Sequence, residues 1–412
     1  MDNQITENKR DSVGSVMMET MKGYFLELDK AAKSRFRKIA WCTSIGPAEL
    51  LHSMGFLVYF PENHGPLLGL SRTSGDLMLN YTAEGFSRDV RVLPASDSRP
   101  YFSGKIPSRQ TYGLEIPLPD VLVYNSNQNR DVKDWFTWYA QKLKKPILEV
   151  ITPSNIGDIK DDELSGISQQ LRDMIPTLEK VSGNKFDEDR LKETVALSRQ
   201  SSELWEACLQ TSAFLPSPWS FFDQILHMGP AIVLRGTNEA VDYYNLLLKD
   251  LQKKIKVGFS AVEHEALRIY WDGMPIWGKL RGLEKLFRSM NSCVVASTYC
   301  NSWVYNQFDE DDPFKGMARA FSEFIMVRDD DYKEFYIKNM FRNFRVNGMI
   351  HFDAKTCPNK NSNRFCMPEG FSKKLGISTL TLTGDLHELY FYNEKQTVTK
   401  IEAFIEQLMK WN

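Results

Sequence analysis

The sequence predicts an α/β protein with two doubly wound parallel-sheet domains, flavodoxin-like or Rossmann-like, joined by a helical segment. Short apolar runs of strand length alternate with longer segments of helical periodicity, which is typical of a parallel sheet covered by helices. This alternation occurs twice, and 412 residues are too many for a single core. We therefore expect an N-terminal helix plus a first α/β domain over residues 1–155, a helical connector over 156–215 and a second α/β domain over 216–412.

The composition is that of an ordinary globular protein, with 42% hydrophobic and 25% charged residues. Lys and Arg number 51 against 53 Asp and Glu, for a formal charge of −2. Neither nucleic acid nor a membrane is therefore an expected partner. No apolar run of membrane-spanning length and no export signal is visible, so we expect a cytoplasmic protein. The six cysteines lack zinc-ribbon spacing and are too few for a disulfide scaffold, which predicts reduced thiols.

In the first half, apolar residues at helical spacing predict a helix over residues 16–36. Pro47 suits the first turn of a second helix and Gly55 its far end. Further helices are expected at residues 67–85 and 131–143. The predicted strands are the buried runs KIAWC, FLVYF, DVLVYNSN and PILEVI, residues 38–42, 56–60, 120–127 and 146–151.

The connector, residues 156–213, carries long helical periodicity with many charges and no strand signal. The second half then repeats the alternation. Its predicted strands are ALRIYWDG, CVVAST, VNGMIHF and ISTLTLTGD, and a last helix ends near Trp411. The turn after VNGMIHF carries Cys357 and Cys366. Because the carboxyl ends of parallel strands meet at one edge of a sheet, we expect functional groups in these turns.

The turn after the first strand combines Cys42, Ser44 and Glu49 at the start of a helix, where free N–H groups favour an anion or a polarised carbonyl. Ser44 and Glu49 are candidate catalytic residues. Glu49 is equally well explained as a partner of the helix dipole, and Cys42 as a small buried residue. His64, in a Pro/Asn/Gly turn, is a candidate general acid or base; the alternative is a turn histidine bonded to backbone.

Three further segments predict substrate contacts. Arg235 precedes Gly and Thr in a loop and suits a phosphate group, although a surface arginine before a helix-starting threonine fits nearly as well. Trp271, Asp272 and Trp277 surround a Gly/Pro turn and could wall a pocket for a flat or apolar acyl group, with core packing as the alternative. Asn301 lies where the strand CVVAST runs into hydroxyls, an amide and a thiol.

Three cysteines, Cys42, Cys300 and Cys357, fall at predicted strand ends. Thiolates that converge on one cleft could ligate an iron–sulfur cluster, although the sequence alone does not bring them within reach.

Seven segments together resemble the B-type subunit of benzoyl-CoA reductase and, more distantly, the 2-hydroxyacyl-CoA dehydratases. They are WCTSIGPAELL, VYFPENHG, NSNQNRDVKDWFTWYA, VLRGTNEAV, RIYWDGMPIWGKLR, ASTYCNSW and DAKTCPNKNSNRFCMPE. The resemblance extends from about residue 40 to the C-terminus. It implies two α/β domains with a [4Fe–4S] cluster between them, a homologous cluster-bearing subunit as heterodimer partner, and an ATP-dependent iron–sulfur protein that supplies electrons.

The sequence departs from this family at the implied cluster ligands. Arg91 and Asn129 stand at two of the three positions where the resemblance implies a cysteine, and only Cys357 matches. An amide is a poor substitute for a thiolate on iron, and a guanidinium offers no lone pair. A [4Fe–4S] cofactor is therefore doubtful, unless Cys42, Cys300 or Cys366 rebuilds the site.

The leading hypothesis is a subunit of a reductase-like or dehydratase-like complex, active on acyl-CoA in anaerobic metabolism, whose own cluster site is lost or altered. It would bind the acyl-CoA or a cluster-bearing partner subunit. In that case Arg235 would face the CoA phosphates, Trp271 and Trp277 the acyl group, and Glu49 and His64 would donate protons. The alternatives are an active reductase or dehydratase with an atypical cluster, and a non-catalytic scaffold.

Overall fold

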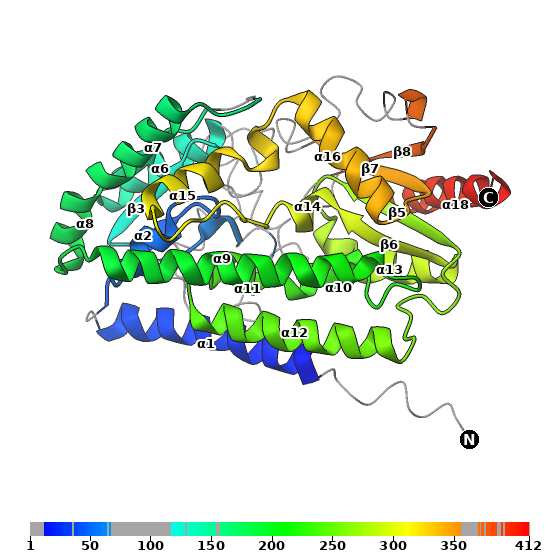
Figure 1. The fold of residues 1–412 in the computed structure, drawn as a ribbon, viewed down its shortest axis with the longest axis horizontal. Coiled ribbons are helices and arrows are strands. Elements are labelled where there is room, and N and C mark those ends of the chain that lie inside the picture. The colour runs from blue at the N-terminus through cyan, green and yellow to red at the C-terminus, as the bar shows by residue number, and fades with distance from the viewer. Residues whose placement is uncertain are drawn as a thin grey trace.

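The computed structural model contains two four-stranded, all-parallel sheets surrounded by helices (Figure 1). It describes residues 12–34, 37–63, 66, 117–127, 130–153, 157–355, 370, 372–374, 376–384, 389 and 392–411. The predicted α/β fold with two parallel sheets is confirmed. The domain limits at residues 155 and 215 stay a prediction, and the helix expected at residues 67–85 lies outside the described residues.

The first sheet has the strand order β2-β1-β3-β4. Its strands are β1 (Ile39–Cys42), β2 (Leu57–Tyr59), β3 (Val121–Asn125) and β4 (Ile147–Val150). On one face, Trp41 and Tyr124 pack against aromatic side chains of α6 (Arg130–Leu143), among them Tyr139. On the other face, Ala40 and Val123 belong to the large core that continues into the second half of the chain. Burial of both faces explains why these strands are continuous apolar runs.

The second sheet has the order β6-β5-β7-β8, with β5 (Leu267–Asp272), β6 (Ser292–Ser297), β7 (Gly348–Ala354) and β8 (Ser378–Gly384). Side chains alternate across it. Trp271 and Ile350 face the large core, whereas Tyr270 and Met349 pack against α16 (Asp330–Asn343).

Helices from the middle of the chain join the two sheets. The long helices α9 (Glu188–Gln210) and α12 (Asn238–Lys256) pack together, and α1 (Ser12–Ser34) lies alongside α12 (Figure 1). The other helical elements are α2 (Ala48–Ser53), η1 (Pro61–Asn63), α7 (Asp161–Asp173), α8 (Ile175–Ser182), η2 (Thr211–Ala213), α10 (Phe221–His227), α11 (Gly229–Val233), η3 (Trp277–Lys279), α13 (Leu280–Ser289), α14 (Thr298–Asn301), α15 (Pro313–Ser322), η4 (Ile325–Val327) and α18 (Glu394–Trp411). Among the described residues, no helix is both long and apolar enough to cross a membrane.

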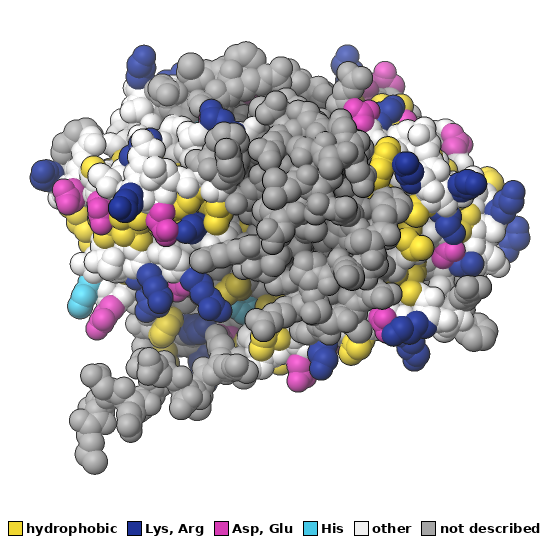
Figure 2. All heavy atoms as spheres, turned by 180° about the vertical axis from the view of Figure 1, so that it is seen from behind, with side chains coloured by type: hydrophobic (Ala, Val, Ile, Leu, Met, Phe, Trp, Pro, Cys, Tyr) yellow, Lys and Arg dark blue, Asp and Glu magenta, His cyan; other side chains and the backbone are white. Residues whose placement is uncertain are grey.

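Charged side chains of both signs are mixed on one face of the molecule (Figure 2). On the face shown in Figure 2, the described Lys and Arg side chains are interspersed with Asp and Glu and form no continuous field of one sign. This agrees with the formal charge of −2.

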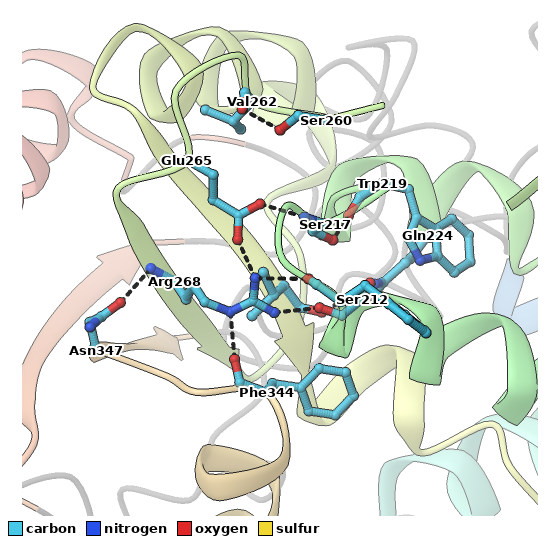
Figure 3. Close-up of polar contacts among 12 residues, drawn as sticks. Ser212, Ser217, Trp219, Gln224, Ser260, Val262, Glu265, Arg268, Phe344 and Asn347 are labelled. Atoms are coloured by element: carbon cyan, nitrogen blue, oxygen red, sulfur yellow. Dashed lines mark hydrogen bonds and ion pairs between the residues drawn. The ribbon is translucent and has the colours of Figure 1, made fainter. Parts of the chain in front are cut away.

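A buried arginine holds the amino end of β5 (Figure 3). Arg268 is 4% exposed and donates from Nε to the carbonyl of Phe344 at 2.6 Å and from Nη1 to the carbonyl of Phe214 at 3.2 Å. It also forms an ion pair with Glu265 and a hydrogen bond to the carbonyl of Ser212. One guanidinium thus ties the segment after α9, the start of β5 and the end of α16 together.

The substitution Arg268→Met should lower the free energy of unfolding by ~3–5 kcal/mol, because it leaves the Glu265 carboxylate buried without its partner. The matched control is Arg288→Met, which removes an ion pair with Glu284 whose arginine side chain is 58% exposed. It should cost at most ~1 kcal/mol. Urea unfolding of both variants checks this, and equal losses would contradict the structural role given to Arg268.

Candidate functional site

Arg235 reaches from the connection between α11 and α12 to the turn at the carboxyl end of β1. Its Nε lies 2.5 Å from Glu49 Oε1, while Nη1 and Nη2 donate to the carbonyls of Ser44 and Gly46 at 3.0 and 2.9 Å. Arg235 is 1% exposed and Glu49 is fully buried. The guanidinium therefore holds the shape of the β1–α2 turn.

Two glycines allow this close approach. A Cβ on Gly46 would lie 2.6 Å from Cys42 Sγ and 2.7 Å from Thr43 Oγ1. Gly236, directly after Arg235, has a φ of +83°, and a Cβ there would lie 2.7 Å from Thr194 Cγ2. These distances are too short for a side chain, so the turn and the arginine loop both require glycine.

The structure gives Arg235 and Glu49 contacts that differ from their predicted roles. The guanidinium of Arg235, predicted to face CoA phosphates, donates its hydrogen bonds to groups within the protein chain. Glu49, predicted to donate protons, accepts from Arg235 and also from Ser198 Oγ at 2.8 Å, while its Oε2 has no hydrogen-bond partner in the described part of the chain. The roles predicted for both residues stay untested predictions.

Glu62 is a candidate that the sequence did not single out. It lies on η1, just beyond the carboxyl end of β2, and is 7% exposed. Its Oε2 accepts a hydrogen bond from the backbone N–H of Ser44 at 2.7 Å, so it lies beside the predicted catalytic serine. The sequence signal that could identify Glu62 is a carboxylate directly after a buried strand. The prediction for this turn names His64 instead. His64 lies outside the described residues.

A chain of hydrogen-bonded polar side chains lies at the carboxyl edge of the second sheet. Asp272 Oδ1 accepts from Thr298 Oγ1 at 2.5 Å, and Asp272 Oδ2 lies 2.7 Å from His351 Nδ1. Tyr270 continues the chain, with its hydroxyl 2.8 Å from Thr298 Oγ1. The other ring nitrogen of His351, Nε2, is buried and has no hydrogen-bond partner among the described residues. Both carboxylate oxygens of Asp272 thus contact side chains of β7 and α14, and its predicted substrate contact stays a prediction.

The two predicted tryptophans lie in different surroundings. Trp271 packs in the core, where it stacks on Phe221 with ring centroids 5.6 Å apart and donates from Nε1 to the carbonyl of Met274 at 3.1 Å. Trp277, on η3, lines an apolar cavity of about 240 Å³ together with Tyr299 and Phe60. Of the two, Trp277 lines the cavity and Trp271 lies in the core; the substrate contacts predicted for both stay predictions.

This apolar cavity brings distant parts of the chain together. Its walls come from the carboxyl end of β2 and η1, from α1, α10 and α11, and from the segments that follow β5 and β6. It therefore lies against the carboxyl edges of both sheets, where α/β proteins commonly bind ligands.

Asn301 belongs to a different cavity. Its Nδ2 donates to the Ser297 carbonyl at 2.8 Å, and the residue lines a polar cavity of about 300 Å³ with Gln210, Asn306 and Tyr336. α14 separates the two cavities, because Tyr299 contributes to one and Asn301 to the other.

The described residues do not provide a ligand set for an iron–sulfur cluster. Among them, no group of three or more His, Cys, Asp or Glu side chains is placed to hold a metal ion. Cys42 and Cys300 are buried; burial raises the pKa of the Cys300 thiol to about 12 and that of Cys42 well above its usual range. Cys357, Cys366, Arg91 and Asn129 lie outside the described residues.

Comparisons with known proteins agree with the resemblance found in the sequence. The (R)-phenyllactyl-CoA dehydratase alpha subunit of Clostridium sporogenes is 26% identical over 386 residues, which cover 92% of this chain and 91% of that protein. The B-type subunit of benzoyl-CoA reductase from Thauera aromatica is 24% identical over 374 residues, covering 87% and 86%. The model of the family described as 2-hydroxyglutaryl-CoA dehydratase, D-component, matches residues 43–408. The chain therefore belongs to the 2-hydroxyglutaryl-CoA dehydratase D-component family.

Proposed function

We propose that this protein is a subunit of a 2-hydroxyacyl-CoA dehydratase-like or benzoyl-CoA reductase-like complex and binds an acyl-CoA thioester. The observation that carries the proposal is the apolar cavity at the carboxyl edges of both sheets, with Trp277 and Tyr299 in its wall. A cavity of this kind accepts an apolar group and leaves a charged CoA moiety outside.

The relatives support a multi-subunit assembly. Their names designate alpha-type or B-type subunits of dehydratases and a reductase, which implies at least one further subunit in those complexes. For this chain we propose a homologous, cluster-bearing subunit as heterodimer partner and an ATP-dependent iron–sulfur activator protein.

The proposed acid–base group is the Glu62 carboxylate, which lies beside Ser44 at the sheet edge. It takes the place of Glu49, because Glu49 is paired with Arg235 in a buried contact. In this proposal Arg235 is a positioning residue that fixes the β1–α2 turn, and with it the Ser44 N–H that donates to the Glu62 carboxylate.

We propose that the chain's own cluster site is lost or altered. Arg91 and Asn129, at two of the positions where the resemblance implies a cysteine, support this. The redox step would then belong to the partner subunit. An atypical cluster on this chain is the competing possibility.

Acyl-CoA binding should be visible as stabilisation. A thioester present at 100 times its Kd adds ~2.7 kcal/mol to the free energy of unfolding. Thermal unfolding with 3-phenylpropanoyl-CoA should therefore give a higher Tm than unfolding with the same concentration of free CoA. If no CoA compound changes the Tm or gives heat in a calorimetric titration, the protein is a scaffold without this ligand.

Iron content tests the state of the cluster site. Protein purified without oxygen should contain far less iron than the roughly four atoms per chain of a complete [4Fe–4S] cluster. It should also lack the broad visible absorption of such a cluster. A full complement of iron that disappears in a Cys357→Ser variant would establish the atypical cluster instead.

The role of Arg235 is tested by stability and binding together. Arg235→Met should lower the free energy of unfolding by ~3–5 kcal/mol, because Glu49 is left buried and unpaired. The double variant Arg235→Met/Glu49→Met should recover much of that loss. The opposite result, intact stability with weakened CoA binding, would restore Arg235 to the phosphate role.

A further inference from the structure

We infer that the acyl group bound by this protein is bulky, apolar and uncharged, either aromatic or branched. This inference rests on the proposed function and names the substrate class of the same cavity. It concerns a property that differs among relatives, whose names specify phenyllactyl, hydroxyisocaproyl, lactoyl and hydroxyglutaryl thioesters.

The lining of the cavity that the structure describes is mostly apolar. Aliphatic and thioether groups of α1, α10 and α11 form one part, including Met21 and Ile232. The rings of Phe60, Trp277 and Tyr299 form another. No Lys, Arg, His, Asp or Glu is present among the described residues that line it. Against this described part of the lining, a carboxylate on the acyl chain would lose its hydration without gaining a counter-charge, which disfavours a glutaryl-type group.

The size of the cavity also favours large acyl groups over small ones. A cavity of about 150 Å³ lined by aliphatic and aromatic residues is already large enough to bind benzene. The present cavity measures about 240 Å³, so an aromatic ring or a branched chain with its linking carbons can enter. A two- or three-carbon acyl group would leave much of that volume unfilled and would gain little from the apolar walls.

Two of the polar residues in the lining, Asn63 and Tyr299, can orient such a ligand. The Tyr24 hydroxyl is already engaged, because it donates to the Val58 carbonyl at 3.0 Å. Tyr299 also lines the cavity, and burial raises the pKa of its hydroxyl, which therefore stays protonated and can donate. The Asn63 side chain also lines the cavity. One hydroxyl and one amide suit the carbonyl or hydroxyl oxygen of an acyl thioester, and neither supplies the charge that a second carboxylate would need.

The test compares thioesters that differ only in the acyl group. Isothermal titration calorimetry with 3-phenylpropanoyl-CoA, propanoyl-CoA, glutaryl-CoA and free CoA gives four values of Kd. We expect 3-phenylpropanoyl-CoA to bind at least about tenfold more tightly than propanoyl-CoA, the effect of burying one aromatic side group. Glutaryl-CoA should bind no better than propanoyl-CoA.

A charged variant links this preference to the cavity. Leu226 lines the cavity and is 54% exposed, so a larger polar side chain fits at its rim. Leu226→Arg should improve glutaryl-CoA binding about fivefold, the effect of one partly exposed ion pair. The matched control Leu226→Gln adds a polar side chain without charge and should leave glutaryl-CoA binding unchanged. Circular dichroism confirms that both variants fold.

The measured Kd values distinguish a wrong acyl class from a failure of the proposed function. If all three thioesters bind with the same Kd, or glutaryl-CoA binds best, the protein binds CoA compounds but the inferred acyl class is wrong. The same holds if Leu226→Arg and Leu226→Gln behave alike, because the acyl group then lies elsewhere. If neither the thioesters nor free CoA bind, the proposed function itself fails.

Discussion

The buried contact between Arg235 and Glu49 is the interaction on which the candidate site depends. It joins residues 186 positions apart and brings the α11–α12 connection onto the turn after β1. Three hydrogen-bonded groups on one guanidinium fix that turn, and the turn in turn presents the Ser44 N–H to Glu62. Burying two charges is expensive, and a single unpaired member would be more expensive still. The pair therefore specifies one arrangement of the turn more than it adds stability.

The cavity follows from how the sheets and the middle helices are assembled. Parallel strands bring their carboxyl ends to one edge, and here two such edges contribute walls to a single apolar space. Helices α1, α10 and α11 supply the remaining walls. The polar chain through Asp272 and His351 lies at the same edge of the second sheet but on the face toward α16, so it links β5 to β7 without lining the cavity.

Much of the fold could be predicted because its signals are local. Continuous apolar runs such as FLVYF and VNGMIHF mark strands buried on both faces, and each became a strand of a parallel sheet. The candidate site was harder to predict from the sequence, because its contacts join segments that are distant along the chain. Glu49 and Arg235 were each singled out, but nothing local showed that they pair with each other. Trp271 and Trp277 are close in sequence and looked alike, yet only Trp277 reaches the cavity, because the strand ends between them.

The two ends of strand β5 have different roles, one in holding the fold together and one in forming the cavity. The contacts of Arg268 join three segments at its amino end, whereas the residues just past its carboxyl end reach the wall of the apolar cavity. The two ends of this strand thus contribute to different parts of the molecule, one to the packing of the fold and the other to the cavity. Because these two ends are separate, side chains near Trp277 can differ without disturbing the contacts of Arg268, and the relatives are named for very different thioesters.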